Sequence, residues 1–392
     1  MIKNIIPTLS TDVSFHPINK NDYFIHQSKY DHRIKISAEF HDFIKLIDNK
    51  KNLNEILSEY NVKYNSNLTF DFAYDFLYNK LAHYGIIVSE TTSVIPSTKP
   101  SYLKLNFIVF NERIVSKITK HLHFLFAPKF LLTILVLALF ILSFCFYEYN
   151  YEIFKKGISK TQWLYFFLLS FVGVTFHEIG HASAAHYYGA QHGGIGGGFY
   201  LFMPVYFADV TDIWKLPKSQ RIAVNLAGMY FELIYVLLLI LIAFIFKLPY
   251  LVVFGCIIVL SSLRNLNPFI RSDGYWVLSD ATEKQNLMLH GFLAIKRLFL
   301  SRKNWLSINY FLLIYGLISY SFMLFFIYYV VIKNPDSILY FPQNLKHFIV
   351  NLFSQNFEFS LAELGKLLIP VLFFYLLYGF IKSLFSKIIV KK

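Results

Sequence analysis

Cysteine is scarce in this sequence: its 392 residues include only Cys145 and Cys256. Both lie in long apolar stretches and far apart, which excludes a disulfide framework and the paired spacing of a zinc knuckle. We expect both to be packing residues. A secretory signal peptide is also lacking, because the first thirty residues carry scattered charges and no continuous apolar core.

Acidic residues are few as well. Asp and Glu number 24 against 37 Lys and Arg, which gives a formal net charge of +13. Such a charge can serve nucleic-acid binding, but no nucleic-acid motif accompanies it. The basic residues cluster beside apolar segments, where they can contact anionic lipid headgroups. We therefore expect a lipid bilayer as a partner, and no nucleic acid.

Apolar residues make up 56% of the chain and its mean hydropathy is +0.46, which is too apolar for an ordinary soluble enzyme. The sequence predicts a multi-pass α-helical membrane protein. Its six expected spans lie at about 130–147, 162–188, 222–246, 248–264, 305–332 and 367–381. The placement of Lys and Arg around these spans puts both chain termini on the cytoplasmic side.

The sequence predicts a small α+β domain at residues 1–95. Tyr23–His26 and Arg33–Ser37 alternate like the strands of a hairpin. The helical spacing of apolar residues predicts helices at Ala38–Ile47, Leu53–Tyr60 and Phe70–Tyr84, with Asn52 as a cap and Ile86–Val88 as a closing strand. Residues 96–129 read as a linker and a basic segment on the membrane surface. Residues 130–284 form the expected membrane core, followed at 285–392 by an interfacial helix and the last two spans.

One short motif contains the candidate metal ligands and the candidate general base. His177 and His181 lie four residues apart, so on a helix they share a face and can bind one metal ion. Glu178 lies beside them as a candidate general base, in the His-Glu-x-x-His pattern of zinc hydrolases. No residue from Trp163 to Phe176 is charged. Ionisable groups at such a place in a membrane are costly, which marks them as functional.

A catalytic zinc usually has three protein ligands, and Asp273 is the candidate for the third. The second and fourth spans run in the same direction, so Asp273 reaches the same membrane face as the histidines. Pro268 cannot continue a regular helix, and Gly274 permits unusual backbone angles. Together they could turn Asp273 back into the bundle.

The two motifs together resemble those of the site-2 protease family of intramembrane zinc metalloproteases (peptidase family M50). That family pairs His-Glu-x-x-His with a later Asn-x-x-Pro-x-x-x-x-Asp-Gly, which this chain matches at Asn265, Pro268, Asp273 and Gly274. The resemblance covers roughly residues 120–290. It implies that His177, His181 and Asp273 bind Zn²⁺, that Glu178 is the general base, and that Asn265 supports the substrate or transition state.

A second resemblance concerns the N-terminal domain. The order of its elements from Phe40 to Val88 is similar to that of PqqD-like domains, a winged-helix type that holds the leader peptides of ribosomally made peptides. Recognition in that family adds the leader as an extra strand at a sheet edge. With this domain, the whole chain resembles the peptide zinc metalloproteases of bacterial peptide-maturation clusters. A generic helical accessory domain is the alternative.

Other polar residues have less specific interpretations. His186 lies five residues after His181, so it does not share the face of the two ligands. The glycines at 193–198 indicate closely approaching backbone, such as a re-entrant hairpin that offers an edge to an extended peptide, or a flexible loop. Asp209 and Asp212 read as solvated residues. Glu232, inside the third span, either supports the metal site or hydrogen-bonds another helix.

The expected function is hydrolysis of a peptide bond in a membrane-associated or ribosomally made precursor peptide. An ABC-type peptide exporter is a further expected partner, and the resemblance implies a bacterial cell membrane as the location. Two alternatives stay open. One is a non-proteolytic component of a peptide export or immunity system. The other is a regulatory site-2 protease that cleaves an anti-sigma factor.

Overall fold

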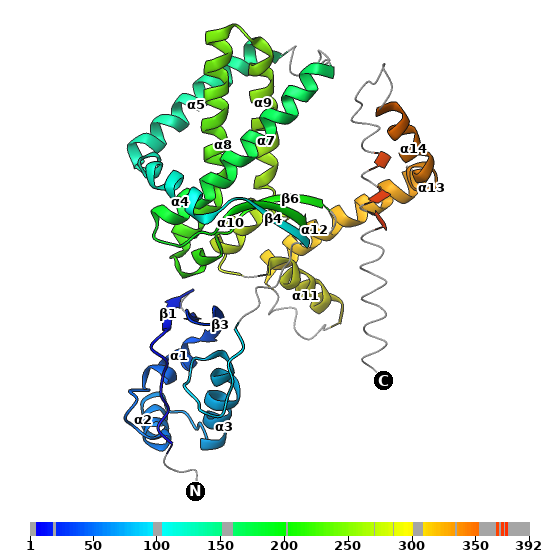
Figure 1. Ribbon diagram of the computed structural model, residues 1–392. Coiled ribbons are helices and arrows are strands. Elements are labelled where there is room, and N and C mark those ends of the chain that lie inside the picture. Colours follow the sequence, from blue (N-terminus) through cyan, green and yellow to red (C-terminus); the bar gives the residue numbers. More distant parts are fainter. Residues whose placement is uncertain are drawn as a thin grey trace.

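The computed structural model describes residues 5–18, 21–96, 104–150, 160–200, 203–269, 271–284, 286–300, 309–333, 335–352 and six residues between 366 and 374. This part of the chain is mostly helical, with a small sheet near the N-terminus and a second sheet beside the helical bundle. Figure 1 shows the bundle above, the second sheet across its lower part, and the N-terminal unit below.

Four helices are long and apolar enough to cross a membrane, and they coincide with the first four expected spans. They are α5 (Pro128–Glu148), α7 (Lys160–Tyr187), α8 (Lys218–Phe246) and α9 (Pro249–Leu263). Buried residues of α5, α8 and α9 form a common apolar core that includes both cysteines. Cys145 and Cys256 are therefore packing residues, as expected.

The prediction of six spans is not confirmed. In place of the fifth, the structure has α12 (Tyr310–Tyr328), which begins after Asn309 because the side chain of Asn309 accepts a hydrogen bond from the backbone N–H of Leu312. Helix α12 is apolar along its 19 residues and lies within the expected fifth span, but it is not among the four helices identified as long enough to cross a membrane within the described residues. The sixth expected span lies mostly outside the described residues. The helices around α12 are α11 (Leu287–Leu300), α13 (Pro335–Leu339) and α14 (Phe341–Leu352).

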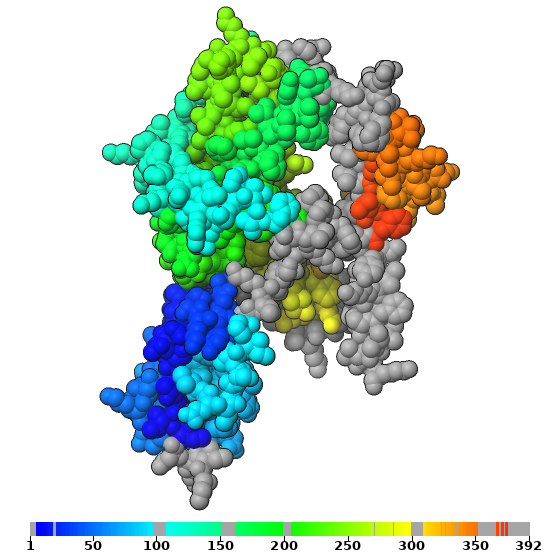
Figure 2. All heavy atoms as spheres, in the orientation of Figure 1, coloured from blue at the N-terminus to red at the C-terminus, as the bar shows by residue number. Residues whose placement is uncertain are grey.

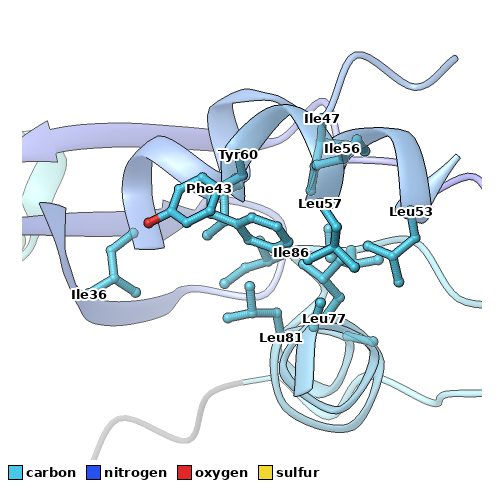
Figure 3. Close-up of a cluster of buried hydrophobic side chains, with 14 of the residues drawn as sticks. Ile36, Phe43, Ile47, Leu53, Ile56, Leu57, Tyr60, Leu77, Leu81 and Ile86 are labelled. Carbon is cyan, nitrogen blue, oxygen red and sulfur yellow. The ribbon is translucent and has the colours of Figure 1, made fainter. Parts of the chain in front are cut away.

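The N-terminal unit combines a three-stranded antiparallel sheet with three helices. The strands are β1 (Val13–Pro17), β2 (Asp22–Gln27) and β3 (His32–Ser37), in the order β1-β2-β3. The helices are α1 (Ala38–Lys45), α2 (Leu53–Tyr64) and α3 (Phe70–Tyr74), and α3 continues through a π-helical turn at Asp75–Leu81. Figure 3 shows how Phe43, Leu57 and Leu77 meet in the core of this unit.

Local sequence rules account for most of this unit. Asn52 caps α2 in a capping box with Glu55, as expected. The expected strand at Ile86–Val88 is only an isolated bridge between Ile87 and Leu9. Figure 2 shows the unit as a lobe below the bundle. Burial lowers the pKa of His16 on β1, and the charge of Lys215 acts in the same direction, which places β1 near the segment that precedes α8.

The second sheet has the order β4-β5-β6, with β4 at Lys104–Phe110, β5 at Ile195–Tyr200 and β6 at Met203–Ala208. Within the segment expected to lie on the membrane surface, β4 pairs with β5 before α4 (Glu112–His121) begins; its position relative to a membrane stays a prediction. The glycine-rich segment is a strand and not a loose loop. A Cβ at Gly196 would meet the backbone of Phe107 on β4, so glycine allows the two strands to approach.

Candidate metal centre

Helix α7 places the three residues of the His-Glu-x-x-His motif as its periodicity predicts. His177 and His181 are both buried, and their Nε2 atoms lie 3.0 Å apart. Asp273 Oδ2 lies 3.0 Å from His177 Nε2, and Asp273 Oδ1 lies 3.5 Å from His181 Nε2. Among the described residues, this is the group whose ligand atoms converge closely enough to hold one metal ion.

Asp273 reaches the histidines because the chain turns sharply after α9. The hydroxyl of Ser272 donates to the carbonyl oxygens of Asn265 and Asn267, both at 2.9 Å. Asp273 is then the first residue of α10 (Asp273–Ala281). Gly274 serves this turn differently from the expectation: it is part of the helix, and a Cβ there would meet the carbonyl of Leu266. The glycine thus permits a close approach and not an unusual backbone angle.

The other ring nitrogens of the two histidines are bound to α8. His181 Nδ1 lies 2.8 Å from the carbonyl oxygen of Val224, which can only accept a hydrogen bond, so this nitrogen carries the proton. His177 Nδ1 lies 3.2 Å from the carboxylate of Glu232. Glu232 therefore contacts a candidate ligand on another helix, so this one hydrogen bond agrees with both interpretations of the residue. Hydrogen bonds of this kind fix the tautomer and ring orientation of metal ligands.

The donor set fits a metal ion. With both Nδ1 atoms protonated, the two Nε2 atoms and the Asp273 carboxylate are three acceptors that face one another at 3.0–3.5 Å. Acceptors this close repel unless a proton or a metal cation lies between them. Two imidazole nitrogens and one carboxylate are ligands of catalytic zinc sites that leave a position open. Gly228 on α8 faces both Nε2 atoms, where a Cβ would meet them.

The replacement Glu232→Gln is expected to weaken metal binding by about 10–100-fold, the usual effect of losing an outer hydrogen-bond partner of a ligand. The amide keeps the size of the side chain but no longer offers a carboxylate to His177 Nδ1. Competition with a coloured chelator, followed by elemental analysis of the purified protein, measures the affinity. An affinity within twofold of wild type would show that Glu232 only links helices.

Glu178 lies on the side of the ligands that faces β6. It is 9% exposed, and its Oε2 accepts a hydrogen bond of 2.7 Å from the backbone N–H of Ala208, the last residue of β6. The neighbouring N–H, that of Asp209, donates to Gly194 on the β5 side. Successive N–H groups of a strand point to opposite edges, so the N–H of Ala208 lies on the outer edge of β6. The outer edge of β6 therefore ends beside the Glu178 carboxylate.

A buried polar network connects α10 with α8. Arg221 is only 2% exposed; its Nε donates to Asp280 Oδ1 at 2.7 Å, and Asn225 Nδ2 donates to Asp280 Oδ2 at 3.0 Å. Burial raises the pKa of Asp280, while the hydrogen bonds from Arg221 and Asn225 act against that rise. Asp280 lies two helical turns after Asp273, so the network holds the helix that presents the third ligand.

Sequence reasoning missed this network. It counted Arg221 among the basic residues before the third span, whereas the residue lies inside α8 and is buried. One signal was available in the sequence. Asp280 is the only charged residue between Gly274 and Ala281 and shares a helix face with Asp273 seven residues earlier.

The remaining candidate residues lie around this centre. Asn265 is half-buried in a 3₁₀ turn at Arg264–Leu266, and its contribution to substrate binding stays a prediction. His186 Nδ1 lies 2.8 Å from the hydroxyl of Thr119. The interpretation of Asp209 and Asp212 as merely solvated is wrong. Asp209 accepts a hydrogen bond from the hydroxyl of Thr211, and Asp212 accepts one from the backbone N–H of Gln191.

A cavity of 420 Å³ opens beside the metal ligands. Glu178, His181 and Asp273 line one side of it, and Arg221, Asn225 and Asp280 also contribute to its lining. Its volume falls within the range of about 300–1,000 Å³ that is typical of small-molecule and substrate sites. Two of the three candidate ligands, His181 and Asp273, and the candidate base Glu178 are therefore accessible from a preformed cavity.

Comparisons with known proteins give one distant relative. The chain is 25% identical over 132 residues to the protein named "Putative peptide zinc metalloprotease protein YydH" from Bacillus subtilis (strain 168). The match covers 32% of this chain and spans about half, 52%, of that relative. No family model matches the chain. No solved structure matches it either. The relative loosely supports a metallopeptidase activity and the use of zinc.

Proposed function

We propose that this protein is a membrane-embedded zinc metallopeptidase of the site-2 protease type that cleaves a precursor peptide. The observation that carries the proposal is the convergence of His177, His181 and Asp273, with Glu178 beside them and a cavity lined by Glu178, His181 and Asp273. Two of the four helices long enough to span a membrane form this site: α7 carries both histidines, and α8 binds their other ring nitrogens. The name of the distant relative supports the same activity.

The residues have separate roles in the proposed reaction. A zinc ion at this centre supplies Lewis acidity toward the scissile carbonyl and the attacking water. Glu178 accepts a proton from that water and delivers it to the leaving amine, so that it returns to its starting state. The N–H of Ala208 holds the Glu178 carboxylate in place. The Nδ1–H groups of His177 and His181 donate hydrogen bonds to the Glu232 carboxylate and to the carbonyl oxygen of Val224. The Nε2 lone pairs therefore remain directed toward the metal.

The substrate binds as an extended strand along the outer edge of β6. A peptide bond inside a helix is hydrogen-bonded and poorly accessible, whereas an added strand exposes its backbone to the site. This edge ends at Glu178, so a peptide paired with β6 passes the catalytic group. Asn265 is proposed to support the substrate or the transition state from the turn before Asp273.

The N-terminal unit is proposed to capture the precursor. Strand β3 pairs with β2 on one side only within the described sheet. A groove of 650 Å³ lies along its other side, between β3 and the π-helical turn, and is lined by residues that include Ile34, Phe40, Phe76 and Tyr84. A peptide strand added to β3 would place its side chains against these apolar residues. A leader peptide is the ligand that this arrangement suits.

The replacement Phe76→Ala is expected to reduce processing of the full-length precursor by about 10-fold, since Phe76 lines the groove and stacks on Phe40 at 4.5 Å. A buried aromatic contact of this kind contributes about 1–2 kcal/mol. Val62→Ala is the matched control, because Val62 is 83% exposed on α2 and is not among the residues that line the groove. Equal processing by both variants, at equal thermal stability, would contradict a role of the groove.

The proposed location is a bacterial cell membrane, with both termini and the catalytic centre toward the cytoplasm. The lipid bilayer, a precursor peptide and an ABC-type exporter are the proposed partners. The alternatives are a non-proteolytic component of an export or immunity system, and a regulatory protease acting on an anti-sigma factor. The complete set of three ligands and a base favours an active peptidase.

The test compares peptides in native cells that express the wild-type chain or the Glu178→Gln variant. Mass spectrometry is expected to find an uncut precursor that accumulates in the variant, together with loss of its product. That result would also identify the substrate. Identical peptide profiles at equal expression would overturn the proposal in favour of a non-proteolytic function.

A further inference from the structure

The cavity beside the metal ligands has an aromatic wall. Trp214, Trp276 and Phe207 line it together with Glu178 and Asp273. Trp214 belongs to the 3₁₀ turn at Thr211–Lys215, which follows β6, and Trp276 lies on α10. The two indole rings meet edge to face with their centroids 6.4 Å apart. Elements on both sides of the cavity therefore contribute to one aromatic surface.

Two residues of this aromatic surface are close in sequence to residues of the catalytic site. Trp276 lies three residues after Asp273 on the same helix, so the two side chains lie on neighbouring parts of one face. Phe207 precedes Ala208, whose N–H binds Glu178. Any peptide positioned for attack between Glu178 and Asp273 thus has the aromatic wall within reach of its nearest side chains.

Two charged residues that line the cavity are paired with each other: Arg221 and Asp280 lie 2.7 Å apart, and the Arg221 guanidinium lies over the Trp214 ring at 5.9 Å from its centroid. Arg271 also lines the cavity. Trp276, in contrast, is 41% exposed. An indole ring exposed in a cavity gains free energy when an apolar ligand covers it, at about 25 cal/mol per Å² of buried apolar surface. The wall therefore favours an apolar or aromatic group over a charged one.

We propose that this cavity is the specificity pocket of the enzyme and that it selects a peptide with a large apolar or aromatic side chain next to the scissile bond. The inference rests on the proposed peptidase function and adds a substrate class to it. Trp276 provides the main contact surface, and Trp214 and Phe207 complete the wall. The selected residue is Phe, Trp, Tyr or Leu, and small or charged residues are poor substitutes.

The test uses the full-length, zinc-loaded protein in lipid nanodiscs. The substrates are twelve-residue peptides of Ala, Gly and Ser in which one central position is Phe, Leu, Ala, Asp or Lys, and cleavage is followed by mass spectrometry. Wild type is expected to cut the Phe and Leu peptides at least 10-fold faster than the others, at a bond next to that residue. In Trp276→Ala this preference should fall to within about twofold, whereas Trp276→Phe should retain it.

Trp163→Ala is the matched control, because Trp163 is at the start of α7 and packs on Phe166 and Phe167, not on the cavity. The pocket assignment is overturned if Trp276→Ala keeps the wild-type preference, or if wild type cuts all five peptides at equal rates. Cleavage without preference leaves the peptidase function intact, so the two ideas can fail separately.

If no peptide is cut, that result counts against the proposed peptidase function and not against the pocket. A binding measurement then tests the pocket by itself. The central residue is replaced by 4-nitrophenylalanine, an uncharged aromatic residue that quenches nearby tryptophan fluorescence, and the peptide is titrated into the Glu178→Gln protein. Trp276→Phe in that background should bind within threefold and Trp276→Ala at least 10-fold more weakly. Equal affinities, or no quenching, would overturn the pocket assignment.

Discussion

Purified Glu178→Gln protein is expected to retain its metal ion and to lose about 10³-fold in turnover, within the range of about 10²–10⁴ typical of a lost general base. Glu178 is buried beside the ligands but is not one of them. Glutamine has nearly the same shape, and its amide oxygen can still accept the hydrogen bond from Ala208 that holds the side chain. The amide cannot take a proton from water, so only the chemical step is lost.

Elemental analysis and steady-state cleavage of the identified precursor measure the two effects on one sample. Glu232→Gln is a matched control, because it is the same replacement at another buried glutamate of the site. It should lower metal affinity and restore much of the turnover when zinc is supplied in excess. A Glu178→Gln protein with turnover within 10-fold of wild type would remove Glu178 from the role of base.

The replacement Gly228→Ala is expected to weaken metal binding by more than about 100-fold, beyond the loss that follows removal of an outer hydrogen bond. The added methyl group would meet the Nε2 atoms of His177 and His181 and the ring edge of His177. Gly228 lies in the interior of α8, and alanine is the better helix former, so the helix itself should not suffer. The ligands would have to move away from their common point.

The same replacement at Gly255 is the control. Gly255 lies on α9, where a Cβ would lie 3.2 Å from Cγ1 of Val236 and 3.5 Å from Cγ1 of Ile240, and no candidate metal ligand is among its neighbours. Gly255→Ala should therefore bind metal as wild type does. Metal affinity and thermal stability of the metal-free proteins separate a blocked site from a misfolded bundle. Tight zinc binding by Gly228→Ala would show that the ligands reach the metal from another direction.

The sequence predicted the elements whose signals are local. The spacing of His177 and His181 requires only one helix face, and Asn52 and Glu55 carry their capping box within four residues. The four long apolar helices follow from composition in the same way. The candidate third ligand was predictable because Pro268 cannot continue a regular helix, so the chain can turn before Asp273; the expected role of Gly274 in that turn was wrong, since it lies inside α10.

The features that were not predicted from the sequence depend on contacts between elements that are far apart in the chain. β4 was assigned to a surface segment because its partner, β5, lies about ninety residues later and consists largely of glycine, which has no strand preference. Arg221 could not be told from a surface charge until Asp280 was seen opposite it. Likewise, the role of Glu232 depends on the face that α8 turns toward His177.

The support that α8 gives to the site has a consequence for the surrounding lipid. Arg221, Asn225, Gly228 and Glu232 are spaced four, three and four residues apart, so they form one stripe along the helix. At about 1.5 Å per residue the stripe is about 16 Å long, roughly half the thickness of a hydrocarbon core of about 30 Å. These side chains are buried against α7 and α10, so the stripe faces the protein interior. Charged groups can therefore extend across half of the bilayer along α8 without contact with the acyl chains.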